Sequence, residues 1–149
     1  MKATDIREAE QLNLVIIHGG KAYTAWMTQN GLPEYLGFLM LELLMHPEIT
    51  QKQLVELTGY PKQSINKGVK KLLDQHFLQQ TVDPLDNRIK RCSLTTPGRK
   101  FAEKKLQPLI EIEDTTSRKL GTKKMQQLIA LNEEWNSIFW HEIRNRGIK

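Results

Sequence analysis

Cysteine is almost absent from this chain of 149 residues, and its scarcity restricts the class of protein. Cys92 is the only cysteine, so no disulfide can form within the chain. Small extracellular domains that rely on a disulfide framework are therefore excluded, and a reducing compartment is favoured. We expect Cys92 to pack within a strand. Lys90 and Arg91 beside it leave a redox-active thiolate as the alternative.

Long hydrophobic runs and secretion signals are missing as well. The most apolar stretch, Leu36 to Met45, contains Gly37 and Glu42 and is shorter than the ~20 residues of a bilayer-spanning helix. Acidic residues lie within residues 5–10, where a signal peptide would be basic or apolar. The sequence therefore predicts a cytoplasmic protein without a membrane partner.

Catalytic and metal-binding motifs are a third absence. The sequence has no glycine-rich phosphate loop, no nucleophile elbow and no His-Glu-x-x-His motif. Its four histidines are far apart in the sequence: His18, His46, His76 and His141. Only residues that converge in the folded chain could build such a site. We expect no enzyme activity, no cofactor and no metal.

Positive charge, by contrast, is concentrated in one segment. Residues 61–105 contain 11 Lys and Arg against 4 Asp and Glu, which gives this segment +7. Because the whole chain carries +5, the remainder carries −2. Such a local excess favours a polyanionic partner, and the motifs below indicate double-stranded DNA.

A helix-turn-helix pattern overlaps the basic segment. Thr50 and Gln53 have the spacing of a reciprocal capping box at the start of a first helix. Leu54 and Leu57 are expected to face inward along that helix. Gly59 then permits the left-handed backbone of a turn into a second helix.

The second helix is predicted to read DNA. Its apolar positions recur at helical spacing and form one buried stripe: Ile65, Val69, Leu72 and Leu73. Polar side chains occupy its first turn and its opposite face: Lys62, Gln63, Ser64, Asn66, Lys67 and Lys70. Amides can pair with adenine, and lysines can reach guanine or phosphate, so these are candidate DNA-binding residues. The solvated face of an ordinary amphipathic helix is the alternative.

A hairpin pattern follows the second helix. Two short β-prone runs, residues 77–82 and 89–94, are separated by a turn-rich stretch, and we interpret them as a wing. Arg88 near its tip is placed to enter a minor groove, with Asp86 orienting the guanidinium and Lys90 near phosphate. A solvated turn with an incidental ion pair is the alternative.

Taken in order, these residues resemble the MarR family of bacterial transcription regulators. The match in the two helices comprises Leu54, Gly59, Lys62, Ser64, Ile65, Val69 and Leu72. The wing adds an Asp-x-Arg motif and a Leu-Thr-x-x-Gly motif, formed by Asp86, Arg88, Leu94, Thr95 and Gly98. The chain departs from the family pattern at Pro61, where a capping serine is common, and at residues 75–77, which lack the usual glycine.

The resemblance implies a homodimer with recognition helices in successive major grooves, wings in the flanking minor grooves and, in many members, a small-molecule effector. We accordingly expect a sequence-specific DNA-binding transcription regulator, by default a repressor, that binds a near-palindromic operator. A winged helix that docks a protein partner with its basic face is the alternative.

The predicted fold class is mainly α with a small β-hairpin wing (α+β), in which helices flank a winged helix-turn-helix. Three regions are expected: an N-terminal dimerisation helix region over residues 1–33, the DNA-binding domain over residues 34–98, and a linker helix with a C-terminal dimerisation helix over residues 99–149. Helices are predicted at about residues 4–28 and 34–46 in the first two regions.

The terminal helices carry features that bear on assembly. Gly19 and Gly20 are expected to kink or split the first helix, Pro108 to bend the linker helix, and Thr122 to cap the last helix. An apolar stripe recurs toward the C-terminus: Leu128, Leu131, Trp135, Ile138 and Phe139. A second protomer is the economical partner for it, and completion of the protomer's own core is the alternative.

An effector site is predicted between the dimerisation helices and the DNA-binding domain. Aromatic side chains with a few polar groups could line it: His18, Tyr23, Trp26, Tyr35 and Phe38. Ordinary core packing of these aromatics is the alternative. The identity of the ligand does not follow from the sequence.

Overall fold

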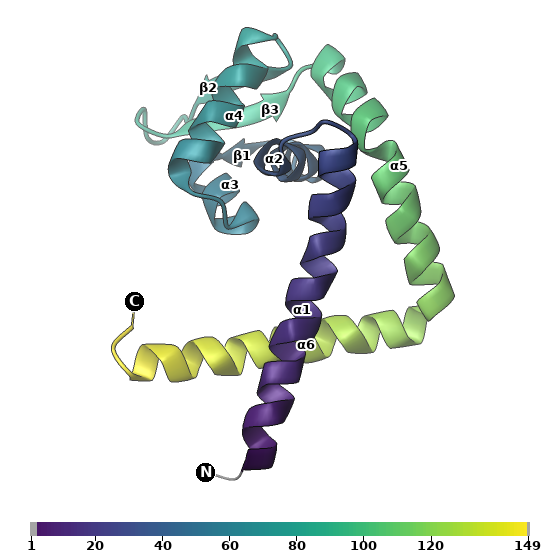
Figure 1. Ribbon diagram of the computed structural model, residues 1–149. Coiled ribbons are helices and arrows are strands. Elements are labelled where there is room, and N and C mark those ends of the chain that lie inside the picture. The colour runs from purple at the N-terminus through teal and green to yellow at the C-terminus, as the bar shows by residue number, and fades with distance from the viewer. Residues whose placement is uncertain (1–2, 149) are drawn as a thin grey trace. The chain divides into compact units, whose positions relative to one another are not determined.

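Helices dominate the computed structural model, which describes the backbone of residues 3–148 and side chains from residue 7 onward (Figure 1). The described elements, in order, are α1 (Ala3–Gln29), α2 (Glu34–Met45), β1 (Ile49–Thr50), α3 (Gln51–Thr58), α4 (Lys62–Asp74), β2 (Leu78–Val82), β3 (Lys90–Leu94), α5 (Thr96–Leu120) and α6 (Thr122–Asn145). The predicted fold class is confirmed. The chain divides after Gln107 into two compact units. None of the described helices is long and apolar enough to cross a membrane.

The sheet has three antiparallel strands in the order β1-β3-β2. The predicted hairpin is present, with Leu78 opposite Leu94 and Val82 opposite Lys90. Strand β1 was not predicted, because two residues are too short to show a periodic pattern. It is defined only by its partner strand, where Ile49 lies opposite Cys92.

The core of the first unit lies where α1 ends against the segment from α2 to β3, residues 34–94, which we call the reading head (Figure 1). Fully buried side chains come from every helix of this unit: Met27, Leu39, Met40, Leu43, Leu54, Ile65, Leu72 and Leu106. The prediction for Leu57 is wrong, since 55% of this side chain is exposed. In the eight-residue helix α3, only Leu54 is buried.

Helix α1 runs without interruption through Gly19 and Gly20, so the predicted split is absent. A glycine costs roughly 1 kcal/mol relative to alanine inside a helix, which a helix of 27 residues can tolerate. Nothing lies within 4 Å of a Cβ built at either position. No neighbouring group crowds α1 at Gly19 or Gly20, so packing does not force the helix to break at these residues.

The ends of α5 and α6 show which residues serve as caps. The Thr95 hydroxyl accepts a hydrogen bond from the Gly98 N–H at 3.1 Å and caps α5. Gly121 ends α5 and, with a φ of 92°, also precedes α6. Thr122 is therefore the first residue of α6, and no side chain caps that helix. Pro108 lies inside α5.

Candidate nucleic-acid interface

The turn between α3 and α4 is fixed by short-range hydrogen bonds. The predicted capping box forms, because Thr50 and Gln53 satisfy each other's backbone N–H groups. Gly59 adopts the predicted left-handed backbone, with a φ of 69°. The Pro61 carbonyl accepts from the N–H groups of the first turn of α4, including that of Ser64 at 2.9 Å. Pro61 thus starts the helix without a capping side chain.

Helix α4 buries one face and exposes the other. Its buried positions are Ile65, Gly68, Val69 and Leu72, whereas Leu73 is half-buried. A Cβ at Gly68 would lie 2.6 Å from the Leu39 side chain, so α4 packs closely on α2. The predicted DNA-binding residues Lys62, Gln63, Asn66, Lys67 and Lys70 are exposed, and Ser64 is half-buried. These six residues form what we call the reading face.

Asn66 of the reading face is held from a neighbouring helix. The Gln51 side-chain amide, at the start of α3, donates to Asn66 Oδ1 at 3.4 Å. Gln51 was not among the predicted site residues, because it is close to Asn66 only in the folded chain. Because this contact uses the carbonyl oxygen of Asn66, the side-chain N–H groups of Asn66 remain available as donors.

The wing tip carries the predicted Asp86–Arg88 pair. Two guanidinium nitrogens of Arg88 donate to the two Asp86 carboxylate oxygens, at 3.1 and 3.2 Å. The Arg88 N–H also donates to Asp86 Oδ1 at 3.0 Å. These hydrogen bonds from Arg88 lower the pKa of Asp86. The Arg88 side chain is nevertheless 91% exposed, so it is oriented by Asp86 and open to a partner.

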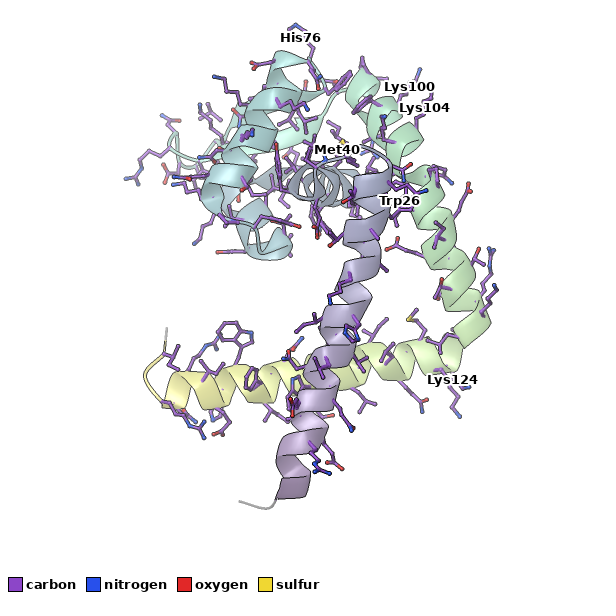
Figure 2. The ribbon with its side chains drawn as sticks, viewed as in Figure 1. Trp26, Met40, His76, Lys100, Lys104 and Lys124 are labelled. Atoms are coloured by element: carbon purple, nitrogen blue, oxygen red, sulfur yellow. The ribbon has the colours of Figure 1, made fainter. Side chains whose placement is uncertain are left out.

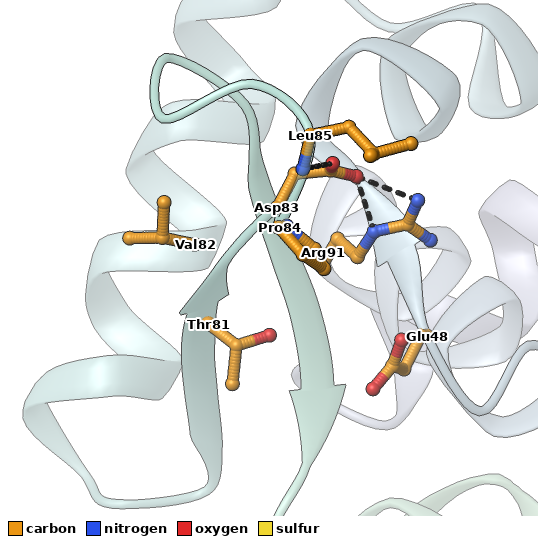
Figure 3. A pocket seen from close by; sticks show the side chains of 7 residues that line it. All are labelled: Glu48, Thr81, Val82, Asp83, Pro84, Leu85 and Arg91. Atoms are coloured by element: carbon orange, nitrogen blue, oxygen red, sulfur yellow. Dashed lines mark hydrogen bonds and ion pairs between the residues drawn. The ribbon is translucent and has the colours of Figure 1, made fainter.

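A second ion pair closes the base of the wing (Figure 3). Asp83 is the one buried charged residue among those described, and its Oδ2 lies 2.6 Å from an Arg91 guanidinium nitrogen. Its Oδ1 accepts the Leu85 N–H at 2.8 Å. The Leu85 N–H and then Arg91 lower the pKa of Asp83. This pair was not predicted from the sequence, because the register of the hairpin brings Asp83 and Arg91 together and the sequence does not give that register.

A cavity of about 370 Å³ lies beside the Asp83–Arg91 pair (Figure 3). It is lined by Glu48, Thr81, Val82, Asp83, Pro84, Leu85 and Arg91. None of these residues belongs to the predicted effector site. The cavity is mainly a feature of the wing, since five of its residues form the continuous segment 81–85.

The predicted effector residues lie on α1 and α2, and only some of them lie close to one another. The rings of Tyr23 and Phe38 are 5.6 Å apart. Tyr35 packs toward α4, where its ring lies 3.4 Å from a Cβ built at Gly68. His18 is exposed and Trp26 is half-buried. The structure therefore brings Tyr23 and Phe38 together, and the assignment of all five to an effector stays a prediction.

The turn that departs from the family pattern uses a histidine in place of glycine. His76 adopts a φ of 57°, and its carbonyl accepts the Thr95 hydroxyl at 2.7 Å. This bond joins the turn to the start of α5, where Lys100 and Lys104 are exposed (Figure 2). These two lysines extend the basic character of the first unit beyond the reading face, and they were not among the predicted site residues.

Cys92 is fully buried in β3, and burial raises the pKa of its thiol. Its sulfur lies 3.4 Å from the Gln80 side-chain amide across the hairpin. This environment agrees with the predicted packing role and disfavours the thiolate that oxidation requires. Within residues 7–148, no group of three potential ligands is arranged to hold a metal ion.

Comparisons with known proteins agree with this architecture. The MarR family model matches residues 38–89. NMB1585, a MarR family regulator from Neisseria meningitidis, is similar with a TM-score of 0.82 at 23% identity, over 93% of this chain and 98% of that one.

Two further solved structures show the same fold. MepR from S. aureus in its DNA-binding conformation has a TM-score of 0.71 at 22% identity, over 87% of this chain and 98% of that one. NadR in complex with 4-hydroxyphenylacetate has a TM-score of 0.74 at 19% identity, over 83% of this chain and 91% of that one. A comparison with curated protein sequences gave no match. The resemblance inferred from the sequence is thus supported by a match of the MarR family model over the winged helix, and the fold of these solved structures is shared over most of the chain.

Proposed function

We propose that the chain is a homodimeric, sequence-specific DNA-binding transcription regulator. The observation that carries this proposal is the reading face, on which exposed amides and lysines line the outer side of a helix whose other side is buried. Exposed amides and lysines on a well-packed helix suit base edges and phosphates. The DNA-binding residues that we assign are Lys62, Gln63, Ser64, Asn66, Lys67, Lys70, Asp86, Arg88 and Lys90.

The wing supports the same proposal. The Asp86 carboxylate holds the guanidinium of Arg88 in a fixed fork, and the base of the wing is closed by Asp83 and Arg91. A side chain held in place before binding loses less conformational entropy when it binds. Arg88 is therefore suited to a narrow minor groove, where the negative potential is strongest.

A homodimer is supported by the exposed apolar residues of the terminal helices. Leu131, Ile138 and Phe139 of α6 are between 52% and 63% exposed, and no described residue of α6 is buried. Its own unit therefore leaves the stripe uncovered, and we propose that a second copy covers it. Two recognition helices in successive major grooves would lie ~34–36 Å apart, so we expect an operator with a near-palindromic sequence.

Repression and effector release are the finer parts of the proposal. A dimer bound across a promoter would block polymerase without any further contact. NadR was solved with 4-hydroxyphenylacetate bound, and by analogy we propose a small-molecule effector for this chain. Regulators of this family are transcription factors rather than enzymes, and we propose no catalytic role.

A protein-interaction module is the competing function. Its docking surface would need an apolar centre, because such centres carry most of the affinity in protein interfaces. The reading face has none, since its exposed members are amides and lysines. This composition favours DNA.

Selection from random duplex DNA by the purified protein tests the proposal. We expect an inverted repeat, with affinity that falls steeply as salt rises and falls again in Arg88→Ala. Arg118→Ala, in α5 outside the reading head, is the matched control and should bind as the wild type does. A folded dimer that enriches no sequence would contradict DNA recognition and favour a protein partner.

A further inference from the structure

Helix α3 lies beside α4 (Figure 1), and a hydrogen bond joins a side chain of one helix to a side chain of the other. The side-chain nitrogen of Gln51 donates to Asn66 Oδ1 at 3.4 Å. Gln51 is half-buried, whereas Asn66 is exposed on the reading face. A residue of α3 thus contacts the polar group of a proposed base reader.

The backbone is anchored at both ends of this hydrogen bond. Thr50, directly before Gln51, caps α3 and lies opposite Arg91 in the sheet. Ile65, directly before Asn66, is fully buried in the core. Because both backbones are packed in place, the hydrogen bond favours one orientation of the Asn66 amide.

The direction of this bond decides what Asn66 can offer to a base. An amide side chain has an oxygen that accepts and an NH₂ group that donates. The Asn66 oxygen already accepts from Gln51, so its two N–H donors are available. In the major groove, purine N7, guanine O6 and thymine O4 are acceptors, whereas cytosine offers only the N4 donor. A cytosine would therefore have to compete with Gln51 for the Asn66 oxygen.

We propose that Gln51 is a positioning residue that sets Asn66 as a hydrogen-bond donor and so disfavours cytosine at the base that Asn66 reads. This inference rests on the proposed function. It assigns Gln51 no contact with DNA. It also states how the base preference can be inverted, because a residue at position 51 that only accepts hydrogen bonds would turn the Asn66 amide over.

Gln51→Glu reverses the hydrogen bond and keeps the length of the side chain. An ionised carboxylate only accepts, so the Asn66 NH₂ group would turn toward it and leave the Asn66 oxygen available to a base. The preferred base group then changes from an acceptor to a donor, which is cytosine N4 or adenine N6.

The test uses the operator found by selection, altered at the base pair whose preference is lost in Asn66→Ala. Each protein is titrated against duplexes with guanine or cytosine at that position, and the ratio of the two affinities is the readout. The wild type should favour guanine about three- to tenfold, the range of one hydrogen bond. Gln51→Glu should favour cytosine.

Charge and simple loss of the bond are controlled separately. The added negative charge weakens binding to all sequences, so it cancels in a ratio taken within one variant. Gln75→Glu makes the same exchange at an exposed residue at the end of α4 and should keep the wild-type ratio. Gln51→Met removes the bond without adding charge, and its ratio should move toward one.

A double variant shows whether Gln51 acts through Asn66. In the Asn66→Ala background, Gln51→Glu should leave the ratio unchanged, because the amide that it turns is missing. A shift toward cytosine that persists in this background would make residue 51 a base reader itself and would overturn the proposal.

Three further outcomes would also overturn it: a wild type that favours cytosine at this position, an Asn66→Ala variant that loses no base preference, and a folded Gln51→Glu with the wild-type ratio. If circular dichroism shows that Gln51→Glu does not fold, Gln51→Met decides, and an unchanged ratio rejects the idea. All of these leave sequence-specific DNA binding intact. A folded wild-type protein that enriches no sequence would instead refute the proposed function.

Discussion

Helices α4 and α6 are both amphipathic, but they differ in what their apolar sides touch. The apolar side of α4 is buried within its own chain, against α2, and only its polar side is exposed. The apolar side of α6 is exposed, and none of its described residues is buried. The apolar side of α4 is thus covered within one protomer, whereas we propose that a second copy covers that of α6. A similar apolar periodicity can therefore mark either a side buried within the protomer or an exposed side. Only the packing around each helix distinguishes the two cases.

Truncation of one leucine in each helix should give opposite results. Leu72→Ala should destabilise the monomer by ~2–5 kcal/mol, because it opens a cavity in a filled core. Leu131→Ala should leave the stability of the monomer nearly unchanged and weaken the dimer. Chemical unfolding and equilibrium sedimentation measure the two effects. A monomer destabilised equally by both changes would remove the distinction between the helices.

Base recognition is the next largest effect and tests the outer side of α4. Gln63→Ala and Asn66→Ala should each cost ~1–3 kcal/mol of operator affinity and relax sequence preference. Gln51→Ala should weaken preference in the same direction but less, because it acts through Asn66. Repeating the DNA selection with each variant checks this. Identical selected sites at wild-type affinity would contradict the assignment of base readers.

The wing should lose order in acid because of Asp83. The pKa of Asp83 is lowered in the folded chain, so its contribution to stability is complete above its ordinary value of 3.8. That contribution is lost as pH falls through the lower folded value. Protection of the Leu85 amide from exchange, measured relative to its intrinsic rate, should therefore fall below pH 3.8 in the wild type, whereas Asp83→Asn should show less protection at every pH and a weaker acid dependence. Equal acid dependence in both proteins would exclude Asp83 as the cause.

Lys70→Ala should have the smallest effect and act on all sequences alike. A phosphate contact contributes about one released counterion, so the slope of log affinity against log salt should fall by ~0.9. Selected and random duplexes should weaken by the same factor. A loss confined to the selected operator would make Lys70 a base reader.

Local signals in the sequence predicted local structure well. The capping box at Thr50, the left-handed Gly59 and the Asp86–Arg88 pair all depend on residues within three positions of one another, and all three are present. The buried stripe of α4 was also predicted, because its period is fixed by helix geometry. Features of this kind need only neighbouring residues, so a short stretch of sequence contains all the information that predicts them.

Features that depend on distant partners were missed or wrong. The pairs Asp83–Arg91 and Gln51–Asn66 require the hairpin register or the packing of two helices, which no short window contains. Leu57 was expected inside because its spacing from Leu54 fits a helical stripe, but α3 has too little contact to cover both. The roles of the predicted DNA-binding and effector residues remain predictions, to be decided by the variants above.

The absence of a side chain at Gly68 has a consequence for how this protein could change its target. Any larger residue there would collide with Leu39 and push α4 outward, so the inner side of the helix admits little variation. On the outer side, Gln63 and Asn66 are exposed. If Gln63 and Asn66 read bases as we propose, single exchanges of these residues would change the operator preference without repacking the fold, and the packing of α4 on α2 would stay constant across such variants.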